Sequence, residues 1–103
     1  MPSVSVIIPV FNAARFLEKC VGSVLGQTFT DFDVCLVDDG STDGSGSLCD
    51  RLASGDRRVR VIHLDRNMGV SAARNRGMRE TDGRWLCFID GDDWVTSTYL
   101  QEL

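Results

Sequence analysis

The sequence contains little lysine and histidine and none of the common phosphate-binding motifs. Lys19 is the single lysine and His63 the single histidine among 103 residues. No GxxxxGK[ST] pattern occurs, and no GxGxxG follows the first apolar segment, which disfavours an ATPase or a dinucleotide-dependent oxidoreductase. The four cysteines form no CxxC pair, so a structural zinc site is not expected.

Positive charge is also scarce, because 11 Lys and Arg stand against 15 Asp and Glu, giving a net charge of −4. This balance argues against nucleic acid as a partner, since proteins that bind it neutralise phosphates with basic residues. No apolar run approaches the ~20 residues that span a bilayer. The first apolar run ends at Pro9 and has no basic stretch before it, unlike a signal peptide. We therefore expect a soluble, cytoplasmic chain with reduced cysteines.

Strand and helix patterns alternate along a chain of the length of one domain. Runs of apolar and β-branched residues predict strands at 3–9, 33–38, 58–64 and 85–89. Apolar residues at helical spacing predict helices at 13–26, 48–53, 69–80 and, as a start only, 96–103. Asn12 is expected to cap the first helix, and Cys35, Trp85, Cys87 and Phe88 to lie in the core. The alternation predicts an α/β, Rossmann-like half with a mainly parallel sheet, strand order 3-2-1-4 and helices on both faces.

Polar clusters follow all four predicted strands. They are Asn12, Asp38–Ser41, Asp65–Asn67 and Asp90–Asp93. The carboxyl ends of parallel strands share one edge of the sheet, and ligands bind there where the strand order reverses. In the order 3-2-1-4 the reversal lies between the first and fourth strands. The loops of Asn12 and Asp90–Asp93 are therefore expected to flank a ligand.

The cluster Asp90-Gly-Asp-Asp93 is the sharpest feature of the sequence. Three carboxylates this close repel one another unless a cation compensates them, and an oxygen-only set suits Mg²⁺ or Mn²⁺. The alternative is a solvated acidic turn in which Asp93 caps a final helix. We favour the metal site because the cluster directly follows a buried strand.

The stretch that begins at Asp38 and Asp39 allows three interpretations. Counted from Asp39, it nearly fits a twelve-residue calcium-binding loop. Against this, a strand precedes it, its third position is Ser41, and its twelfth position is Asp50 rather than Glu. It could be a plain turn. We favour strand-end carboxylates that accept hydrogen bonds from a ligand.

Four further residues have open roles. Arg66 and Arg74 could be diphosphate ligands or surface ion pairs, and His63 is expected to be structural. Trp94 could lie in the core or form a wall of the site.

Five motifs together resemble the family 2 glycosyltransferases, which have the GT-A fold. They occur in the family's order and cover almost the whole chain: Val4-Ser-Val-Ile-Ile-Pro-Val-Phe-Asn12, Ser23-Val-Leu-Gly-Gln-Thr28, Val37-Asp-Asp-Gly-Ser-Thr-Asp43, Gly69-Val-Ser-Ala-Ala-Arg-Asn-Arg-Gly77 and Phe88-Ile-Asp-Gly-Asp-Asp-Trp94. The resemblance implies a metal-assisted, inverting transfer of sugar from a nucleotide-sugar, usually a UDP-sugar, to an acceptor hydroxyl.

The resemblance also implies roles for individual residues. Asp39 would hydrogen-bond the base, and Asp90 and Asp92 would form a DxD-type motif that contacts the ribose and Mn²⁺ or Mg²⁺, with Asp93 as an alternative metal ligand. The expected nucleotide-binding set is Pro9, Phe11, Asn12, Asp38, Asp39, Arg74 and Asp90, and the expected metal set is Asp92 and Asp93.

The catalytic base of the family comes from the region after the DxD motif, so it is expected beyond Leu103. Residues 1–103 would then be a truncated GT-A domain, the donor-binding half, with little or no transfer activity of its own. The saccharide or lipid-linked acceptor would bind the missing half, and the longer parent could lie at the inner face of a membrane. Apolar surface left by the truncation would favour a homodimer or larger species.

We consider two other classes of function. One is a non-catalytic nucleotide-binding or assembly module of a polysaccharide-synthesis protein. The other, a receiver or phosphatase type, is disfavoured because the first strand ends in Pro-Val-Phe-Asn rather than an acidic pair.

Overall fold

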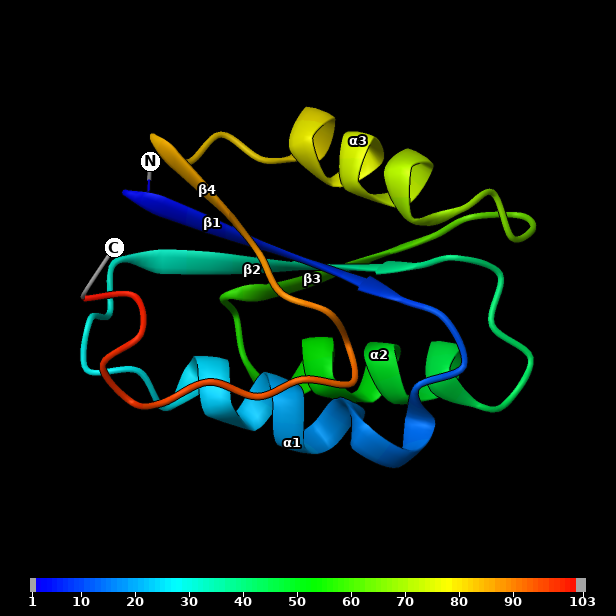
Figure 1. The fold of residues 1–103 in the computed structure, drawn as a ribbon, viewed down its shortest axis with the longest axis horizontal. Coiled ribbons are helices and arrows are strands. Elements are labelled where there is room, and N and C mark those ends of the chain that lie inside the picture. The colour runs from blue at the N-terminus through cyan, green and yellow to red at the C-terminus, as the bar shows by residue number, and fades with distance from the viewer. Residues whose placement is uncertain (1, 102–103) are drawn as a thin grey trace.

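The computed structural model describes residues 2–101, which form seven alternating strands and helices (Figure 1). They are β1 (Val4–Val10), α1 (Ala14–Leu25), β2 (Phe32–Asp38), α2 (Ser45–Gly55), β3 (Val59–His63), α3 (Val70–Glu80) and β4 (Trp85–Phe88). All strand pairs are parallel, and the order in the sheet is β3-β2-β1-β4. The α/β class and the predicted strand order are therefore confirmed.

Helices cover both faces of the sheet, as predicted: α1 and α2 lie on one face and α3 on the other (Figure 1). All seven residues of β1 are buried, because this strand has a neighbour on each side and helices above and below. Alternate residues of β1 serve the two faces. Val6 and Ile8 join the larger core cluster with Leu17 of α1, whereas Ile7 packs with Ala73 of α3 in a smaller one.

The two edge strands differ from the central pair in exposure. β3 is buried only at Val59, and it lies at an edge of the sheet, as the predicted strand order places it. β4 pairs with β1 alone, and Trp85 and Phe88 are 68% and 39% exposed. The prediction that both lie in the core was wrong, because β4 is an edge strand and α3 packs mainly over β1 and β2. Cys87, which turns toward the α1 face, is buried as expected, and so is Cys35.

Several predicted element boundaries differ from those in the structure. The residue at the N-cap of α1 is Ala13, not Asn12, whose backbone turns into the left-handed region with φ 50°. α2 starts at Ser45, three residues earlier than expected. Residues 97–101 form turns instead of a helix, because the carbonyls of Thr96 and Ser97 and the N–H of Leu100 bond to Gln27 and Thr28. Residues 102 and 103 lie outside the described part.

A separate observation concerns membranes. Within residues 2–101, no helix combines the length and the apolar character that crossing a bilayer requires.

Candidate functional site

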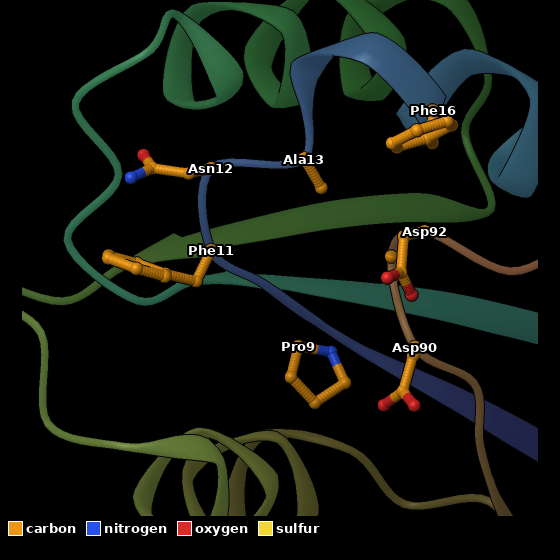
Figure 2. A pocket seen from close by; sticks show the side chains of 8 residues that line it. Pro9, Phe11, Asn12, Ala13, Phe16, Asp90 and Asp92 are labelled. Atoms are coloured by element: carbon orange, nitrogen blue, oxygen red, sulfur yellow. The ribbon is translucent and has the colours of Figure 1, made fainter.

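Two neighbouring hollows open at the carboxyl edge of the sheet, where β1 and β4 diverge. The first, of about 190 Å³, is lined by Pro9, Phe11, Asn12, Ala13, Phe16, Asp90, Gly91 and Asp92. The second, of about 210 Å³, is lined by Pro9, Val10, Phe11, Asp39, Asn67, Gly69, Val70 and Asp90. Figure 2 shows Phe11 and Asn12 on one side of the first hollow and Asp90 and Asp92 on the other, with Pro9 between Phe11 and Asp90.

The two hollows share Pro9, Phe11 and Asp90, so they form one continuous site at the reversal of strand order. The structure thus brings together six of the predicted site residues: Pro9, Phe11, Asn12, Asp39, Asp90 and Asp92. Their side chains come from the ends of three strands, as the order 3-2-1-4 requires.

The loop after β2 is hydrogen-bonded to the turn that contains Asn12. The Asn12 N–H donates to Ser41 Oγ at 3.1 Å, and Asn12 Oδ1 accepts the Thr42 N–H at 2.8 Å. One step further, the Ala13 N–H donates to Ser45 Oγ at 3.0 Å. Ser45 Oγ donates in turn to Asp43 Oδ1 at 2.6 Å, and this bond holds the pKa of Asp43 below its usual value. Asp43 and Ser45 were not among the predicted site residues, because the pattern Asp-Gly-Ser is also common in ordinary turns.

Asp38 and Asp39 face different parts of the molecule. Asp39 is buried, and its two carboxylate oxygens accept the N–H groups of Met68 at 2.7 Å and Gly69 at 3.1 Å. It therefore ties the end of β2 to the loop before α3 and still lines the second hollow. Asp38 is buried as well, but it accepts from Ser41 N–H and contacts His63, and it lines neither hollow.

The acidic loop after β4 is exposed and can hold a cation. Oxygens of Asp90, Asp92 and Asp93 all lie within 4.8 Å of one another. The Arg74 guanidinium, whose Nη2 is 3.7 Å from Asp90 Oδ1, offsets only part of this negative charge. A set of carboxylate oxygens alone, open to solvent, fits the preferences of Mg²⁺ and Mn²⁺. The residues present therefore fit the metal that the sequence analysis expects.

Two other side chains border this loop. The guanidinium carbon of Arg74 lies 5.8 Å from the Phe88 ring centroid, and Arg74 Nε is buried without a partner among the described residues. Trp94 is 59% exposed, and Lys19 Nζ lies 3.7 Å from the centroid of its ring. Trp94 therefore does not lie in the core, which was one of the two roles considered for it. The side chain lines a separate hollow with Arg74 and Asp93.

A hydrogen bond from a residue of α1 holds the backbone of the acidic loop. Cys20 Sγ donates to the carbonyl of Asp90 at 3.4 Å. Burial, followed by the charges of Asp93, Asp92 and Asp90, raises the pKa of the Cys20 thiol to about 12. The thiol therefore stays protonated at neutral pH and serves as a hydrogen-bond donor to this carbonyl.

Comparison with known proteins identifies the family. The profile described as "Glycosyl transferase family 2" matches residues 5–103. The chain belongs to this family. Among curated glycosyltransferases, it is 44% identical over 103 residues to the uncharacterized glycosyltransferase EpsJ of Bacillus subtilis, covering 100% of the chain and 30% of EpsJ.

Solved structures with a similar fold are consistent with this family. S. aureus TarS in complex with UDP-GlcNAc matches with a TM-score of 0.88 and 27% identity, over 97% of this chain and 29% of that one. A mannosyltransferase from Pyrobaculum calidifontis with GDP-Man and Mn²⁺ matches with a TM-score of 0.84 and 27% identity, over 90% and 28%. The chain thus has the fold of the N-terminal part of a GT-A glycosyltransferase and spans about a third of its relatives' length.

Proposed function

We propose that residues 1–103 are the donor-binding part of a glycosyltransferase that takes its sugar from a nucleotide-sugar, most simply a UDP-sugar. The observation that carries this proposal is the continuous site at the divergence of β1 and β4, with the Phe11 ring on one side and carboxylates on the other. Two solved relatives were studied with UDP-GlcNAc and with GDP-Man and Mn²⁺, which supports the ligand class.

Each wall of the site offers a contact to one part of such a donor. The Phe11 ring is half exposed and presents a face on which a nucleobase can stack. Asp39, in the second hollow, retains oxygen lone pairs that accept from a base N–H, because its backbone bonds use only one per oxygen. Asp90 lies between the two hollows, where it can accept from ribose hydroxyls.

The diphosphate belongs beside the acidic loop. Asp92 and Asp93 would hold Mn²⁺ or Mg²⁺, which neutralises the nucleoside diphosphate as the bond to the sugar breaks. Arg74 adds a fixed positive charge 3.7 Å from Asp90 and can reach a phosphate oxygen from α3. Asp38 supports the pocket from behind in this proposal and does not touch the ligand.

Transfer itself is assigned to the longer protein. Because the chain spans only 30% of EpsJ, we propose that the base and the saccharide or lipid-linked acceptor site lie in the part of such relatives that this chain does not cover. Residues 1–103 alone then bind the donor and transfer little. Inversion at the anomeric carbon is part of the same proposal.

Calorimetric titration of UDP into the chain, with and without Mn²⁺, tests donor binding. We expect Mn²⁺-dependent binding that weakens at least about tenfold, or about 1.4 kcal/mol, in Asp92→Asn. Asp82→Asn makes the same chemical change at an exposed carboxylate between α3 and β4 and should bind as the wild type does. Absence of UDP binding in a folded wild-type chain, or full binding in Asp92→Asn, would contradict the proposal.

We also propose that the chain self-associates through β4. Trp85, Leu86 and Phe88 are all exposed along this edge strand, and one side of its backbone has no strand neighbour among the described residues. A second copy can cover these side chains and pair with the free edge.

A further inference from the structure

His63 lies between two carboxylates at the end of β3. Its Nδ1 is 2.8 Å from Asp38 Oδ2, and its Nε2 is 2.8 Å from Asp50 Oδ1. Two carboxylates can both accept from one imidazole only when both ring nitrogens carry protons. The geometry therefore describes an imidazolium that links three elements: β3, the end of β2, and α2.

These contacts continue from Asp38 to the donor site. The other oxygen of Asp38 accepts the Ser41 N–H at 3.0 Å, and Ser41 Oγ accepts the Asn12 N–H at 3.1 Å. Asn12 lines the first hollow. A chain of hydrogen bonds therefore runs from His63, on the edge strand, to the turn that forms one side of the proposed nucleotide pocket.

Packing leaves Asp38 little freedom to adopt another position. Its carboxylate is buried, and α2 passes so close that a Cβ on Gly46 would lie 2.7 Å from Asp38 Oδ2. Asp38 is thus a buried carboxylate, and within residues 2–101 His63 is its one ionic partner. Loss of the imidazolium charge would leave that carboxylate poorly compensated, which is costly in a buried position.

Other charged groups also face His63. Asp65, Arg66 and Arg76 line a hollow of about 500 Å³ with it, from the loop after β3 and from α3. The hydrogen bonds to Asp50 and then to Asp38 raise the pKa of His63, against a smaller opposing effect of burial. The ring is therefore charged below this raised pKa, and the linkage to Asp38 weakens as the pH rises through it.

We propose that His63 is a positioning residue of the donor site: as an imidazolium it fixes Asp38, and through Ser41 it holds Asn12 in place to receive a nucleoside diphosphate. This inference rests on the proposed function, since the ligand is the one proposed there. It predicts that the affinity for the nucleotide falls several-fold when His63 loses its proton.

The test couples two measurements on the same samples between pH 6 and 8.5. Calorimetry gives the affinity for UDP in the presence of Mg²⁺, and NMR of the His63 ring gives its protonation midpoint. Ionisation of UDP is common to all variants, so differences between their profiles report on the protein. In the wild type, we expect the affinity to fall across the midpoint of His63.

Asp50→Asn is the decisive variant, because Asp50 is well exposed and lines neither hollow. Loss of its carboxylate should move both the His63 midpoint and the fall in UDP affinity to lower pH by the same amount. His63→Gln should bind UDP more weakly, without the pH-dependent fall. Asp82→Asn should follow the wild type in both measurements.

Three outcomes would overturn the inference, and they are distinguishable. If Asp50→Asn shifts the His63 midpoint but leaves the UDP profile unchanged, the histidine is structural only. If the midpoint does not move, the contact with Asp50 is absent. If no variant binds UDP while the ring titrates as expected, the proposed function fails, and the role of His63 toward a nucleotide fails with it.

Discussion

Gly77 shows how a single missing methyl group sets the distance between α3 and β1. A Cβ at this position would lie 2.5 Å from Ile7 Cγ2, in the buried contact between helix and sheet. We expect Gly77→Ala to lower the free energy of unfolding by about 1–2 kcal/mol, because overpacking outweighs the gain in helix propensity. Denaturant unfolding measures the change.

Gly22, in the last turn of α1, is the matched control for this change. Apart from its chain neighbours and the backbone of its own helix, no atom lies within 4 Å of a Cβ built there, and the residue is exposed. Gly22→Ala should therefore raise the free energy of unfolding by about 0.5–1 kcal/mol through helix propensity alone. An equal gain in both variants would show that α3 can move away from Ile7 without cost.

The positions of the site residues were easier to predict from the sequence than the directions of their side chains. Asp38 and Asp39 were both placed at the end of a strand, as the structure has them. The pattern could not show that Asp39 bonds to the N–H groups of Met68 and Gly69 while Asp38 turns to His63. Those partners are 25 to 30 residues away, so tertiary packing decides the directions.

At the scale of elements, Gln27 joins the end of α1 to the segment that follows the acidic loop. Its buried amide donates to the carbonyl of Thr96 at 2.6 Å and accepts the Leu100 N–H at 2.8 Å. Gln27→Leu keeps the size but leaves both backbone groups unpaired. We expect a loss of about 2–6 kcal/mol in the free energy of unfolding, at about 1–3 kcal/mol for each unpaired group.

Thr28→Val provides the comparison for Gln27→Leu, because it removes an exposed hydrogen bond to Gln101 in the same region. A change within about 0.5 kcal/mol is expected there, as for most surface substitutions. Hydrogen exchange should locate the effect of Gln27→Leu at the amides of residues 95–100. Unchanged exchange in that segment would show that Gln27 does not fasten it.

The same bonds explain why one element was predicted wrongly. Residues 96–103 have a composition that favours a helix start, and local pattern gave no reason to reject it. In the structure, the Val95 N–H donates to Ser23 Oγ. The Thr96 carbonyl accepts from the Gln27 side chain, and the Leu100 N–H donates to it. Side chains more than 65 residues earlier in the sequence thus replace the bonds of the predicted helix.

At the scale of the whole molecule, self-association should depend on the exposed edge of the sheet. Light scattering at high micromolar concentration is expected to give a mass above that of the monomer. Trp85→Ser should shift the mass toward the monomer, because Trp85 has the most exposed of the large apolar side chains. Met78→Ser, on α3, is a control that should leave the mass unchanged. A monomeric wild type would contradict the prediction.

The strand order was predictable because right-handed crossovers leave few topologies for four alternating strands. The exposure of Trp85 and Phe88 could not be predicted, because an apolar strand has the same sequence pattern whether its faces are covered or open to solvent. Which face is covered depends on neighbours such as α3, which packs over β1 and β2.

The parallel sheet also separates two rims of the molecule. All strands point their carboxyl ends at the donor site, so the connections 26–31, 56–58 and 81–84 lie at the opposite rim. The seven residues of β1 place about 20 Å between the rims. A fluorophore or an affinity tag inserted in one of these connections would therefore leave the ligand's entrance open.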